Sequence, residues 1–570
     1  MLNVEQVLQQ EHPGIFQFPK LITKPTVSFL QLLFHEQQIN NFLKENPGGG
    51  IEFVNNVLEH LEISYKTDNK EILNVPSLGK CIVVANHPLG ALDAFALIQM
   101  LTTVRQNKKI KIVANALLSQ LKPLEEVIIP VDNMSGKLSK GSLKMIEESL
   151  QNEELVIFFP AGEVSRANIN GVTDSQWKKG FLKFAKRTQS PILPIYIDAR
   201  NSFGFYTASM LYKPLGTALL AHEMIRAKNS VIEFTIGELV SPQTVSNMNL
   251  PMKQHAKLFR KHLYKISKGK KGIYKTEQCI AHPESRQTIK QELARAEQLG
   301  VTTDNKLIYL VEHAKAPSLL NEIGRLREYS FRKVGEGSGK HKDLDKYDEY
   351  YQHLVLWDDQ DLEVVGAYRL GECNWILSWI GKEGLYLNEL CEMHDDHDQY
   401  LMEAVELGRS FVQPRYWGSR ALDYLWQGIG AYLHHNPQIR YLTGPVSISA
   451  TYPQNARDAI VYFYSHYFAP KEQSLQARSP YKLSNDTNKE FEELFDGNDY
   501  KVAFTQLKSY LAAFDVNVPT LFKQYSDLCD EGGVTFFDFG IDSDFNDCVD
   551  GYLLVDRKLM KEAKQKRYIK

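Results

Sequence analysis

Residues 84–95 read VANHPLGALDAF and place a histidine at the end of an apolar strand. His87 follows the run CIVVAN (81–86), and Asp93 comes six positions after it. A carboxylate that faces an imidazole can fix its tautomer and stabilise its protonated form, as a general base requires. Because a histidine at a strand end is more often structural than catalytic, the interpretation depends on what the other segments supply.

The same run begins a series of short apolar segments separated by helical periods. They are CIVVAN (81–86), IKIVAN (110–115), EEVIIPV (125–131), ELVIFFP (154–160), PILPIYI (191–197) and SVIEFTIG (230–237). This alternation predicts an α/β domain with a largely parallel sheet over residues 76–264. Residues 1–75 are predicted to be helical and amphipathic, so they either contact a membrane surface or pack on the domain core.

The second half of the chain has a different pattern. Residues 265–299 begin with the basic stretch KISKGKKGIYK and are predicted to form a linker and a helix, with anionic headgroups as a second possible contact. Residues 353–371 predict two strands around a polar turn, 419–436 a helix and 439–449 a strand. Hairpin strands mixed with helices predict an α+β domain over residues 300–570.

Composition narrows the functional classes. A chain of 570 residues with 43% hydrophobic residues is expected to hold two or more domains. A net charge of -3 gives no reason to expect nucleic acid as a partner, and six scattered cysteines without a CxxC pair argue against a zinc site. The run HDDHD (394–398) is interpreted as an exposed loop, so no metal is expected.

The N-terminus and the hydropathy pattern bear on location. The first residues lack the basic and apolar regions of a signal peptide, and no window of about 18 apolar residues occurs. We therefore expect a cytoplasmic protein without a transmembrane helix.

Three later segments support a catalytic role for His87. The run FFPAGEVSR (158–166) ends a strand in a turn at Gly162 and Glu163, whose backbone N–H groups can hold an anion. WKKGFLKFA (177–185) supplies Lys178, and the strand PILPIYI contains Pro194. This order of motifs resembles the glycerolipid acyltransferase family, and the spellings NHPLG and FPAGE resemble its haemolysin-like branch.

The resemblance covers residues 60–240 and implies a function for each motif. Asn86, His87 and Asp93 match the first block of the family, and Gly162 and Glu163 fall in the second. In such enzymes a histidine removes the proton of a hydroxyl as it attacks a thioester carbonyl, and an aspartate orients that histidine. His87 and Asp93 are therefore the expected catalytic pair, while Asn86, Gly162 and Glu163 are expected to bind substrate or donor.

A second constellation lies between residues 323 and 421. It consists of Arg327, Phe331, Asp345, Asp348, Arg369, Glu406 and Arg409. Taken singly, these residues predict a helical packing pair, a solvated turn and an ordinary ion pair. In this order they resemble the acyl-homoserine-lactone synthases and the ornithine-lipid N-acyltransferases of the GNAT superfamily.

That resemblance implies an N-acyl transfer to an amine. Glu406 is expected to hold or deprotonate the amine, and Asp345 and Asp348 to orient a cationic substrate. The loop RYWGSRA (415–421), with Gly418 for close approach, is expected to meet the phosphate of the donor. Arg420 stands where the family has a small residue, so acyl carrier protein is the preferred donor and acyl-CoA is possible. The candidates to contact the carrier protein or its phosphopantetheine are Arg327, Arg369, Arg409 and Arg420.

Both halves together resemble the bifunctional ornithine-lipid synthases. The resemblance implies that the second half N-acylates ornithine with a 3-hydroxyacyl group and that the first half O-acylates the resulting lyso-aminolipid at the cytoplasmic face of the inner membrane. No bound cofactor is expected. Glycine or another amino acid as acceptor, a lysophospholipid acyltransferase, and a non-catalytic membrane scaffold that binds acyl carrier protein remain the alternatives.

Overall fold

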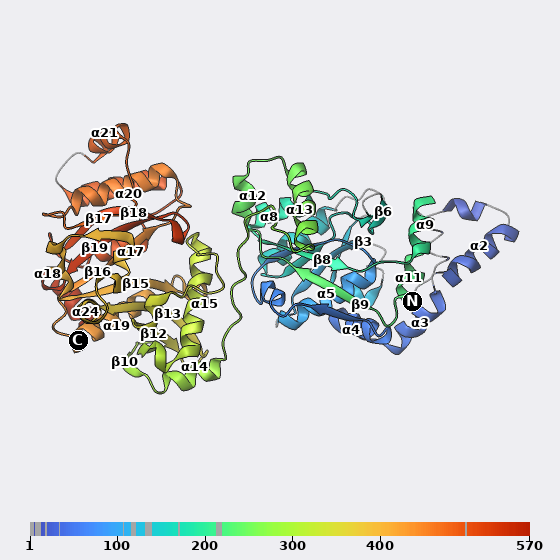
Figure 1. The fold of residues 1–570 in the computed structure, drawn as a ribbon, viewed down its shortest axis with the longest axis horizontal. Coiled ribbons are helices and arrows are strands. Elements are labelled where there is room, and N and C mark those ends of the chain that lie inside the picture. The colour runs from blue at the N-terminus through green and yellow to red at the C-terminus, as the bar shows by residue number, and fades with distance from the viewer. Residues whose placement is uncertain are drawn as a thin grey trace. The chain divides into compact units, whose positions relative to one another are not determined.

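The computed structural model describes residues 5, 9, 13–17, 20–33, 35–105, 108–115, 121–131, 139–168, 171–211, 219–495 and 499–569. The chain forms two compact units, Met1–Cys279 and Ile280–Lys570, each built on its own sheet (Figure 1). The boundary between the units falls inside the predicted linker 265–299. The prediction of an α/β unit followed by an α+β unit is confirmed.

Unit 1 is built on a seven-stranded sheet in the order β1-β9-β8-β2-β5-β3-β4. The strands are β1 (Ser64–Thr67), β2 (Cys81–Ala85), β3 (Ile110–Asn115), β4 (Ile128–Val131), β5 (Leu155–Phe158), β8 (Ile192–Asp198) and β9 (Val231–Ile236). All neighbours are parallel except β8 and β9. A small hairpin, β6 (Arg166–Asn168) and β7 (Gly171–Thr173), follows β5.

Helices cover both faces of this sheet, which is why its strands are apolar on both sides. Cys81, Val83 and Ala85 of β2 face one core, and Ile82 and Val84 face the other. The helices are α2 (Lys20–Leu33), α3 (Glu36–Glu45), α4 (Gly50–His60), α5 (Ala91–Val104), α7 (Lys140–Gln151), α8 (Gly180–Thr188), α9 (Phe203–Leu211), α11 (Leu220–Arg226), α12 (Pro242–Asn247) and α13 (Met252–Ile266).

Three parallel strands bring the predicted motifs of unit 1 to one edge. β2 pairs with β5 on one side and with β8 on the other, with Val84 opposite Phe158 and Pro194. The carboxyl ends of parallel strands lie at the same edge, where loops can assemble a site. The loops that follow β2, β5 and β8 therefore meet there.

Unit 2 is built on an eight-stranded sheet in the order β10-β11-β12-β13-β15-β16-β19-β18. The strands are β10 (Glu297–Val301), β11 (Leu307–Glu312), β12 (Gln352–Asp358), β13 (Glu363–Glu372), β15 (Ala404–Val412), β16 (Tyr441–Ile448), β18 (Val534–Asp542) and β19 (Cys548–Asp556). β14 (Cys391–Met393) and β17 (Leu475–Ala477) form a separate pair. The predicted strands at 353–371 and 439–449 are present.

The helices of unit 2 pack against this sheet or against one another. They are α14 (Arg286–Leu293), α15 (Pro317–Val334), α16 (Cys373–Trp379), α17 (Leu387–Leu390), α18 (Asp398–Leu401), α19 (Ala421–His435), α20 (Gln454–Tyr467), α21 (Asn485–Leu494), α22 (Tyr500–Ala512), α23 (Thr520–Ser526) and α24 (Glu562–Tyr568). In the part of the chain that the structure describes, no helix combines the length and the apolar character needed to cross a bilayer.

Strands β15 and β16 are the parallel neighbours in an otherwise antiparallel sheet. Their pairing covers only Ala404–Glu406 and Tyr441–Thr443, although both strands continue beyond it. Arg409 lies beyond the pairing with β16, at a register shift in the pairing of β15 with β13, and has φ 49°, a left-handed conformation that is costly for a residue with a Cβ. The sheet is therefore opened and strained directly after Glu406.

Candidate active sites

The loop after β2 holds His87 against the first turn of α5. His87 Nδ1 lies 2.9 Å from Asp93 Oδ1, and the Asp93 side chain is fully buried while that of His87 is 19% exposed. The backbone N–H groups of Leu89 and Gly90 donate to the other oxygen, Asp93 Oδ2, at 2.7 and 3.3 Å. Since a carboxylate only accepts, His87 donates from Nδ1, and its Nε2 is left as a proton acceptor.

Two effects of opposite sign set the protonation of His87. Burial lowers the pKa of His87, but the charge and the hydrogen bond of Asp93 outweigh it, so the pKa is raised above its ordinary value of 6.5. The imidazole also stacks on the Phe159 ring, with the centroids 4.0 Å apart. A held imidazole of raised pKa at a solvent-accessible edge can take a proton from a hydroxyl.

A carboxylate that the sequence analysis did not single out joins this loop to the one after β5. Asp174 Oδ1 accepts from the Ser165 hydroxyl at 2.5 Å and from the His87 backbone N–H at 3.2 Å. Its Oδ2 accepts from Trp177 Nε1 at 2.8 Å, and Ser165 N–H donates to the His87 carbonyl at 2.7 Å. Asp174 is only 3% exposed, so it is a positioning residue that fixes the two motif loops against each other.

The protonation of Asp174 reflects the same contacts. Burial raises the pKa of the Asp174 carboxyl, and the hydrogen bonds from Ser165, Trp177 and the His87 backbone oppose that rise. No sequence motif marks this residue, which lies outside both predicted blocks. Its charge also contributes to the raised pKa of His87.

The turn after β5 carries a cation over its glycine. Gly162 has φ +70°, and its N–H donates to the Phe159 carbonyl at 3.0 Å. A Cβ on Gly162 would lie 3.0 Å from Lys178 Nζ, so the Lys178 ammonium lies over this turn. Lys178 N–H in turn donates to the Pro160 carbonyl at 2.8 Å. An exposed ammonium beside the His87 loop can bind an anionic group of a substrate.

Two further predicted residues lie at this edge. Asn86 is 3% exposed and exchanges two hydrogen bonds with the Ile197 backbone, at 2.9 and 2.7 Å, so its amide joins the ends of β2 and β8. Glu163 is half-buried beside Gly162. The structure thus brings the five predicted residues of unit 1 to one edge of the sheet, with Asn86 engaged by backbone.

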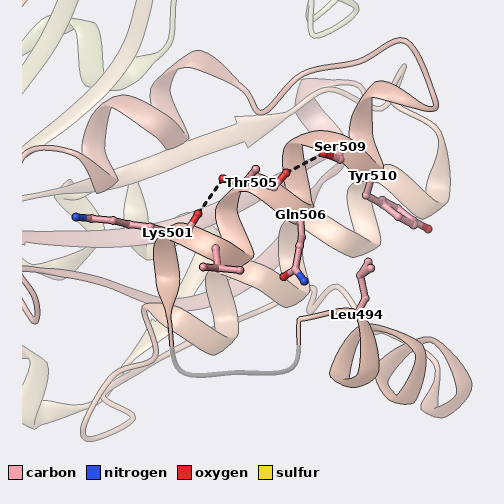
Figure 2. Close-up of a pocket in the computed structure, with 7 residues that line it drawn as sticks. Leu494, Lys501, Thr505, Gln506, Ser509 and Tyr510 are labelled. Atoms are coloured by element: carbon pink, nitrogen blue, oxygen red, sulfur yellow. Dashed lines mark hydrogen bonds between the residues drawn. The ribbon is translucent and has the colours of Figure 1, made fainter.

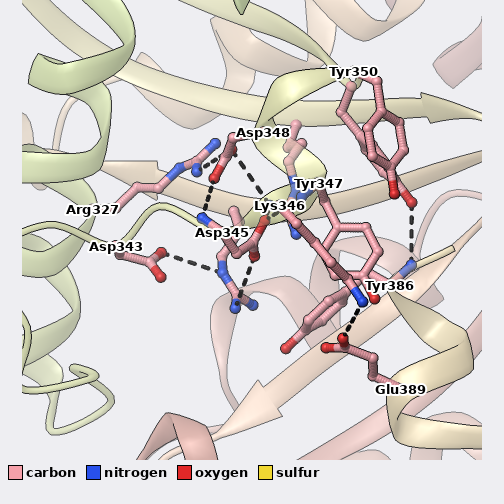
Figure 3. Close-up of polar contacts among 12 residues, drawn as sticks. Arg327, Asp343, Asp345, Lys346, Tyr347, Asp348, Tyr350, Tyr386 and Glu389 are labelled. Carbon is pink, nitrogen blue, oxygen red and sulfur yellow. Dashed lines mark hydrogen bonds and ion pairs between the residues drawn. The ribbon is translucent and has the colours of Figure 1, made fainter. Parts of the chain in front are cut away.

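In unit 2 the predicted residues form a network of ion pairs beneath the opened strands. Arg327 Nη1 of α15 donates to Asp348 Oδ1 at 2.7 Å, and both side chains are buried (Figure 3). Arg369 Nη1 of β13 donates to Asp345 Oδ1 at 2.5 Å and lies 3.4 Å from Asp348 Oδ1. Phe331, one turn after Arg327, packs edge-on against Phe545 with the ring centroids 4.9 Å apart.

Arg409 completes this network with an aspartate that the sequence analysis missed. Its Nε lies 3.2 Å from Asp343 Oδ2, and its Nη2 lies 3.6 Å from Asp345 Oδ2. The guanidinium also lies over the Tyr386 ring, 4.5 Å from its centroid. Three arginines thus face three aspartates, as buried charges require.

The ion pairs set the protonation of the network. Burial raises the pKa of Asp348, but Arg327 and Arg369 outweigh it and hold that pKa far below its usual range. Burial lowers the pKa of Arg369, and its aspartate partners raise it by more. Asp348 and Arg369 are therefore held in their charged forms, whereas burial raises the pKa of Asp343 against the opposing charges of Arg409 and Arg327.

Glu406 is the last residue of β15 that pairs with β16, and it is 1% exposed. Its carboxylate accepts from the Tyr351 hydroxyl at 2.6 Å and from the backbone N–H groups of Tyr386 and Leu387 at 3.1 and 2.8 Å. Burial raises the pKa of Glu406, and these three donors oppose the rise. The carboxylate is held rigidly where the strands part, with a phenol as its polar neighbour.

The predicted donor loop lies between β15 and α19. Gly418 has φ +75° with open space around it, and α19 begins three residues later at Ala421. Arg420 and Arg415 are both exposed in this segment. Arg415 pairs with Asp361 and Glu363, and Arg420 pairs with Asp423. A turn that needs glycine, followed by a fifteen-residue helix, can accept a phosphate at its backbone N–H groups.

One open cavity of about 530 Å³ lies between α21 and α22 of unit 2 (Figure 2). It is lined by Leu494, Lys501, Val502, Thr505, Gln506, Ser509 and Tyr510. None of the predicted site residues lies in this lining, so we do not assign it to either site.

Comparison with known proteins finds an acyltransferase domain in each half of the chain. An acyltransferase family model matches residues 15–238, and an acetyltransferase (GNAT) domain model matches residues 326–427. The chain therefore contains two acyltransferase domains, one in each unit.

Individual relatives match about half of the chain each. A glycine N(alpha)-acyltransferase from Bacteroides thetaiotaomicron is 31% identical over 51% of this chain and 89% of its own length. A lyso-glycine lipid O-acyltransferase from Phocaeicola vulgatus is 30% identical over 47% of this chain and 95% of its own length. An L-ornithine N(alpha)-acyltransferase from Rhodobacter capsulatus is 26% identical over 46% and 95%.

The chain belongs to the families of these N- and O-acyltransferases. It is an enzyme that transfers acyl groups. The predictions of an acyltransferase activity and of a GNAT domain are confirmed.

Proposed function

We propose that this chain makes a two-tailed acylated amino acid in two steps. Unit 2 transfers a 3-hydroxyacyl group from a thioester to the α-amine of an amino acid. Unit 1 then transfers a second acyl group to the 3-hydroxyl of that one-tailed intermediate. The observation that carries the proposal is the His87–Asp93 pair, which can act as a base toward a hydroxyl group. The other unit holds Glu406 at the point where β15 and β16 separate.

In the first step the amine must attack as a neutral nucleophile. We assign Glu406 to hold the α-amine, with the Tyr351 hydroxyl as the polar group that fixes the carboxylate. The donor thioester lies in the opening between β15 and β16, and the phosphate of its arm meets the Gly418 loop. Attack forms the amide N–C bond, the thiolate leaves, and one proton of the amine is released.

In the second step His87 Nε2 removes the proton of the 3-hydroxyl as its oxygen attacks the thioester carbonyl. Asp93 holds the ring through Nδ1 and stabilises the imidazolium that forms. The thiol leaves with the proton that His87 returns. The Lys178 ammonium over Gly162 is placed to bind the carboxylate of the acylated amino acid.

Glycine is the acceptor that we propose, for two reasons. The glycine N(alpha)-acyltransferase is 31% identical over 51% of this chain, whereas the L-ornithine N(alpha)-acyltransferase is 26% identical over 46%. Arg327, Arg369 and Arg409 also balance the charges of the aspartates in the buried network. The δ-ammonium of an ornithine substrate would therefore gain little from these aspartates.

Ornithine is the second candidate because of three neighbouring acids, Asp542, Asp550 and Glu336, of which Asp542 contacts Tyr386. Tyr386 donates to Asp542 at 3.1 Å, and Asp542 and Asp550 repel each other. Burial and the charge of Asp550 raise the pKa of Glu336 to about 8. A δ-ammonium placed among these acids would relieve that repulsion.

Acyl carrier protein is the donor that we propose, since Arg415 and Arg420 flank the loop that meets the phosphate and suit an acidic carrier. Acyl-CoA would use the same loop. We place the reaction at the cytoplasmic face of the inner membrane, because the intermediate and the product are amphiphiles.

Lipid mass spectrometry on a host without aminolipids tests the proposal. Expression of the wild-type chain should yield a two-tailed lipid, His87→Ala only the one-tailed intermediate, and Glu406→Ala neither. A glycine headgroup supports the first candidate and an ornithine headgroup the second. Acylation of lysophospholipid alone, or no new lipid from a well-expressed chain, would refute the two-step scheme in favour of a lysophospholipid acyltransferase or a scaffold.

A further inference from the structure

Helix α9 (Phe203–Leu211) presents an apolar face to solvent beside the unit 1 site. Its sequence FGFYTASML contains no charged residue. Phe203 is 87% exposed and Met210 is 73% exposed, and Thr207 between them is also exposed. The spacings of four and three residues place all of them on one side of the helix.

The opposite face of α9 is fixed to both motif loops. Phe205 and Tyr206 are buried and pack with Val164 of the loop after β5. Asn201, just before the helix, donates from Nδ2 to the Pro88 carbonyl at 2.9 Å, and its N–H donates to the Tyr206 hydroxyl at 3.1 Å. The segment that leads into the helix is thus hydrogen-bonded to Pro88, the residue that follows His87.

A helix in contact with water normally carries polar side chains on its outer face. Here the outer face carries the apolar Phe203 and Met210 with the uncharged Thr207 between them, while the inner face packs on the catalytic loops. Transfer of such exposed side chains from water into an apolar phase is favourable by about 25 cal/mol for each Å² of apolar surface that becomes buried. We propose that this face of α9 enters the headgroup and acyl boundary of a lipid bilayer and brings the unit 1 site to its lipid acceptor.

The inference rests on the proposed function, because it is the one-tailed intermediate that would reside in that bilayer. Charge indicates how the contact is made. The exposed charges just before the helix, Asp198 and Arg200, are of opposite sign. Apolar insertion rather than attraction to anionic headgroups should therefore dominate, unlike contact through the basic residues 265–275.

The test is partition of the full chain onto vesicles of neutral phosphatidylcholine, with and without anionic phosphatidylglycerol, at low and high salt. The wild-type chain should bind both kinds of vesicle, and high salt should weaken binding by less than threefold. Phe203→Ser/Met210→Ser should lower the partition coefficient at least tenfold. The matched control is Leu73→Ser/Leu78→Ser, which removes two exposed leucines before β2 and should change it by less than twofold.

Activity separates this inference from the function on which it rests. The α9 double variant should retain O-acylation of a short-chain, water-soluble hydroxyacyl amino acid and lose at least tenfold in kcat/KM for the same acceptor in vesicles. Binding that requires phosphatidylglycerol, or that survives in the double variant, overturns the α9 inference and leaves the function standing. A wild-type chain that acylates neither acceptor refutes the function, while the partition result still decides the role of α9.

Discussion

His87 Nδ1 lies 2.9 Å from Asp93 Oδ1, and the remaining oxygen of that carboxylate is held by the backbone of Leu89 and Gly90. Because the Asp93 carboxylate is completely buried and accepts hydrogen bonds from these three groups, it is held in one orientation. The ring of His87 is fixed by it, and Nε2 is the nitrogen that can act on a substrate.

We expect Asp93→Asn to lose O-acylation by about 10²–10⁴-fold, because an amide nitrogen that donates to Nδ1 would leave the proton on Nε2. N-acylation by unit 2 should be unchanged. Chromatography with mass detection on purified enzyme would show the one-tailed intermediate accumulating. O-acylation within threefold of the wild-type rate would contradict the assignment of His87 as base.

The pH dependence of O-acylation should follow His87. Its pKa is raised above 6.5 and the base acts when neutral, so the rate should fall as pH drops through that raised value. Asp174→Asn removes a nearby negative charge and should move the midpoint to lower pH by less than one unit.

Ser165→Ala is the control for that experiment. It removes the 2.5 Å hydrogen bond to Asp174 but no charge, so it should leave the midpoint in place while lowering stability. Equal midpoints in the wild-type and Asp174→Asn enzymes would limit Asp174 to a purely structural role. A pH profile of kcat/KM for each variant provides the comparison.

Glu406→Gln should reduce N-acylation at least 100-fold, since the amide keeps the shape of the side chain and loses its charge. Tyr351→Phe removes one hydrogen bond to that carboxylate and should lower the N-acylation rate by about 10- to 150-fold, because a bond to a charged group contributes about 1.5–3 kcal/mol. O-acylation of a supplied intermediate should persist in both. Retention of N-acylation by Glu406→Gln would exclude a carboxylate role at this position.

The Arg327–Asp348 pair should dominate the stability of unit 2. Arg327→Met leaves a buried carboxylate without its nearest partner, and breaking such a pair costs about 3–5 kcal/mol. Lys290→Met removes the exposed pair with Asp359 and should cost well under 1 kcal/mol. Urea unfolding of the two variants gives the difference, and similar values would show that Arg369 compensates for the lost partner.

Gly162→Ala should weaken acceptor binding by unit 1. The residue has φ +70°, and its new Cβ would press on Lys178 Nζ, so we expect KM for the one-tailed acceptor to rise at least fivefold. Gly180→Ala, where nothing lies within 4 Å of the new Cβ, is the control. Steady-state kinetics with unchanged KM for both variants would exclude Lys178 as a ligand of the acceptor.

Much of the fold could be predicted because local periodicity reports local structure. Each apolar run from 81–86 to 230–237 contains a strand, and the predicted hairpin at 353–371 is present. The His87–Asp93 contact was also predictable, since six residues span one strand end and the first turn of α5.

The partners of these groups were not predictable in the same way. Asp174 meets His87 across 87 positions, and it does so because β2 and β5 are neighbours in the sheet. Tyr386 and Asp343 reach Glu406 and Arg409 only through the packing of unit 2. No local spacing encodes such contacts.

The sequence by itself determined the two acyltransferase domains and the residue types for acyl transfer, because motif order and hydrophobic period are properties of short segments. Only the tertiary structure decided that Asn86 joins two strand ends, that Lys178 lies over Gly162, and that three arginines balance three aspartates. These contacts depend on the order of the strands in each sheet, which brings distant residues together. They also depend on burial, because an isolated buried charge is costly and favours pairing.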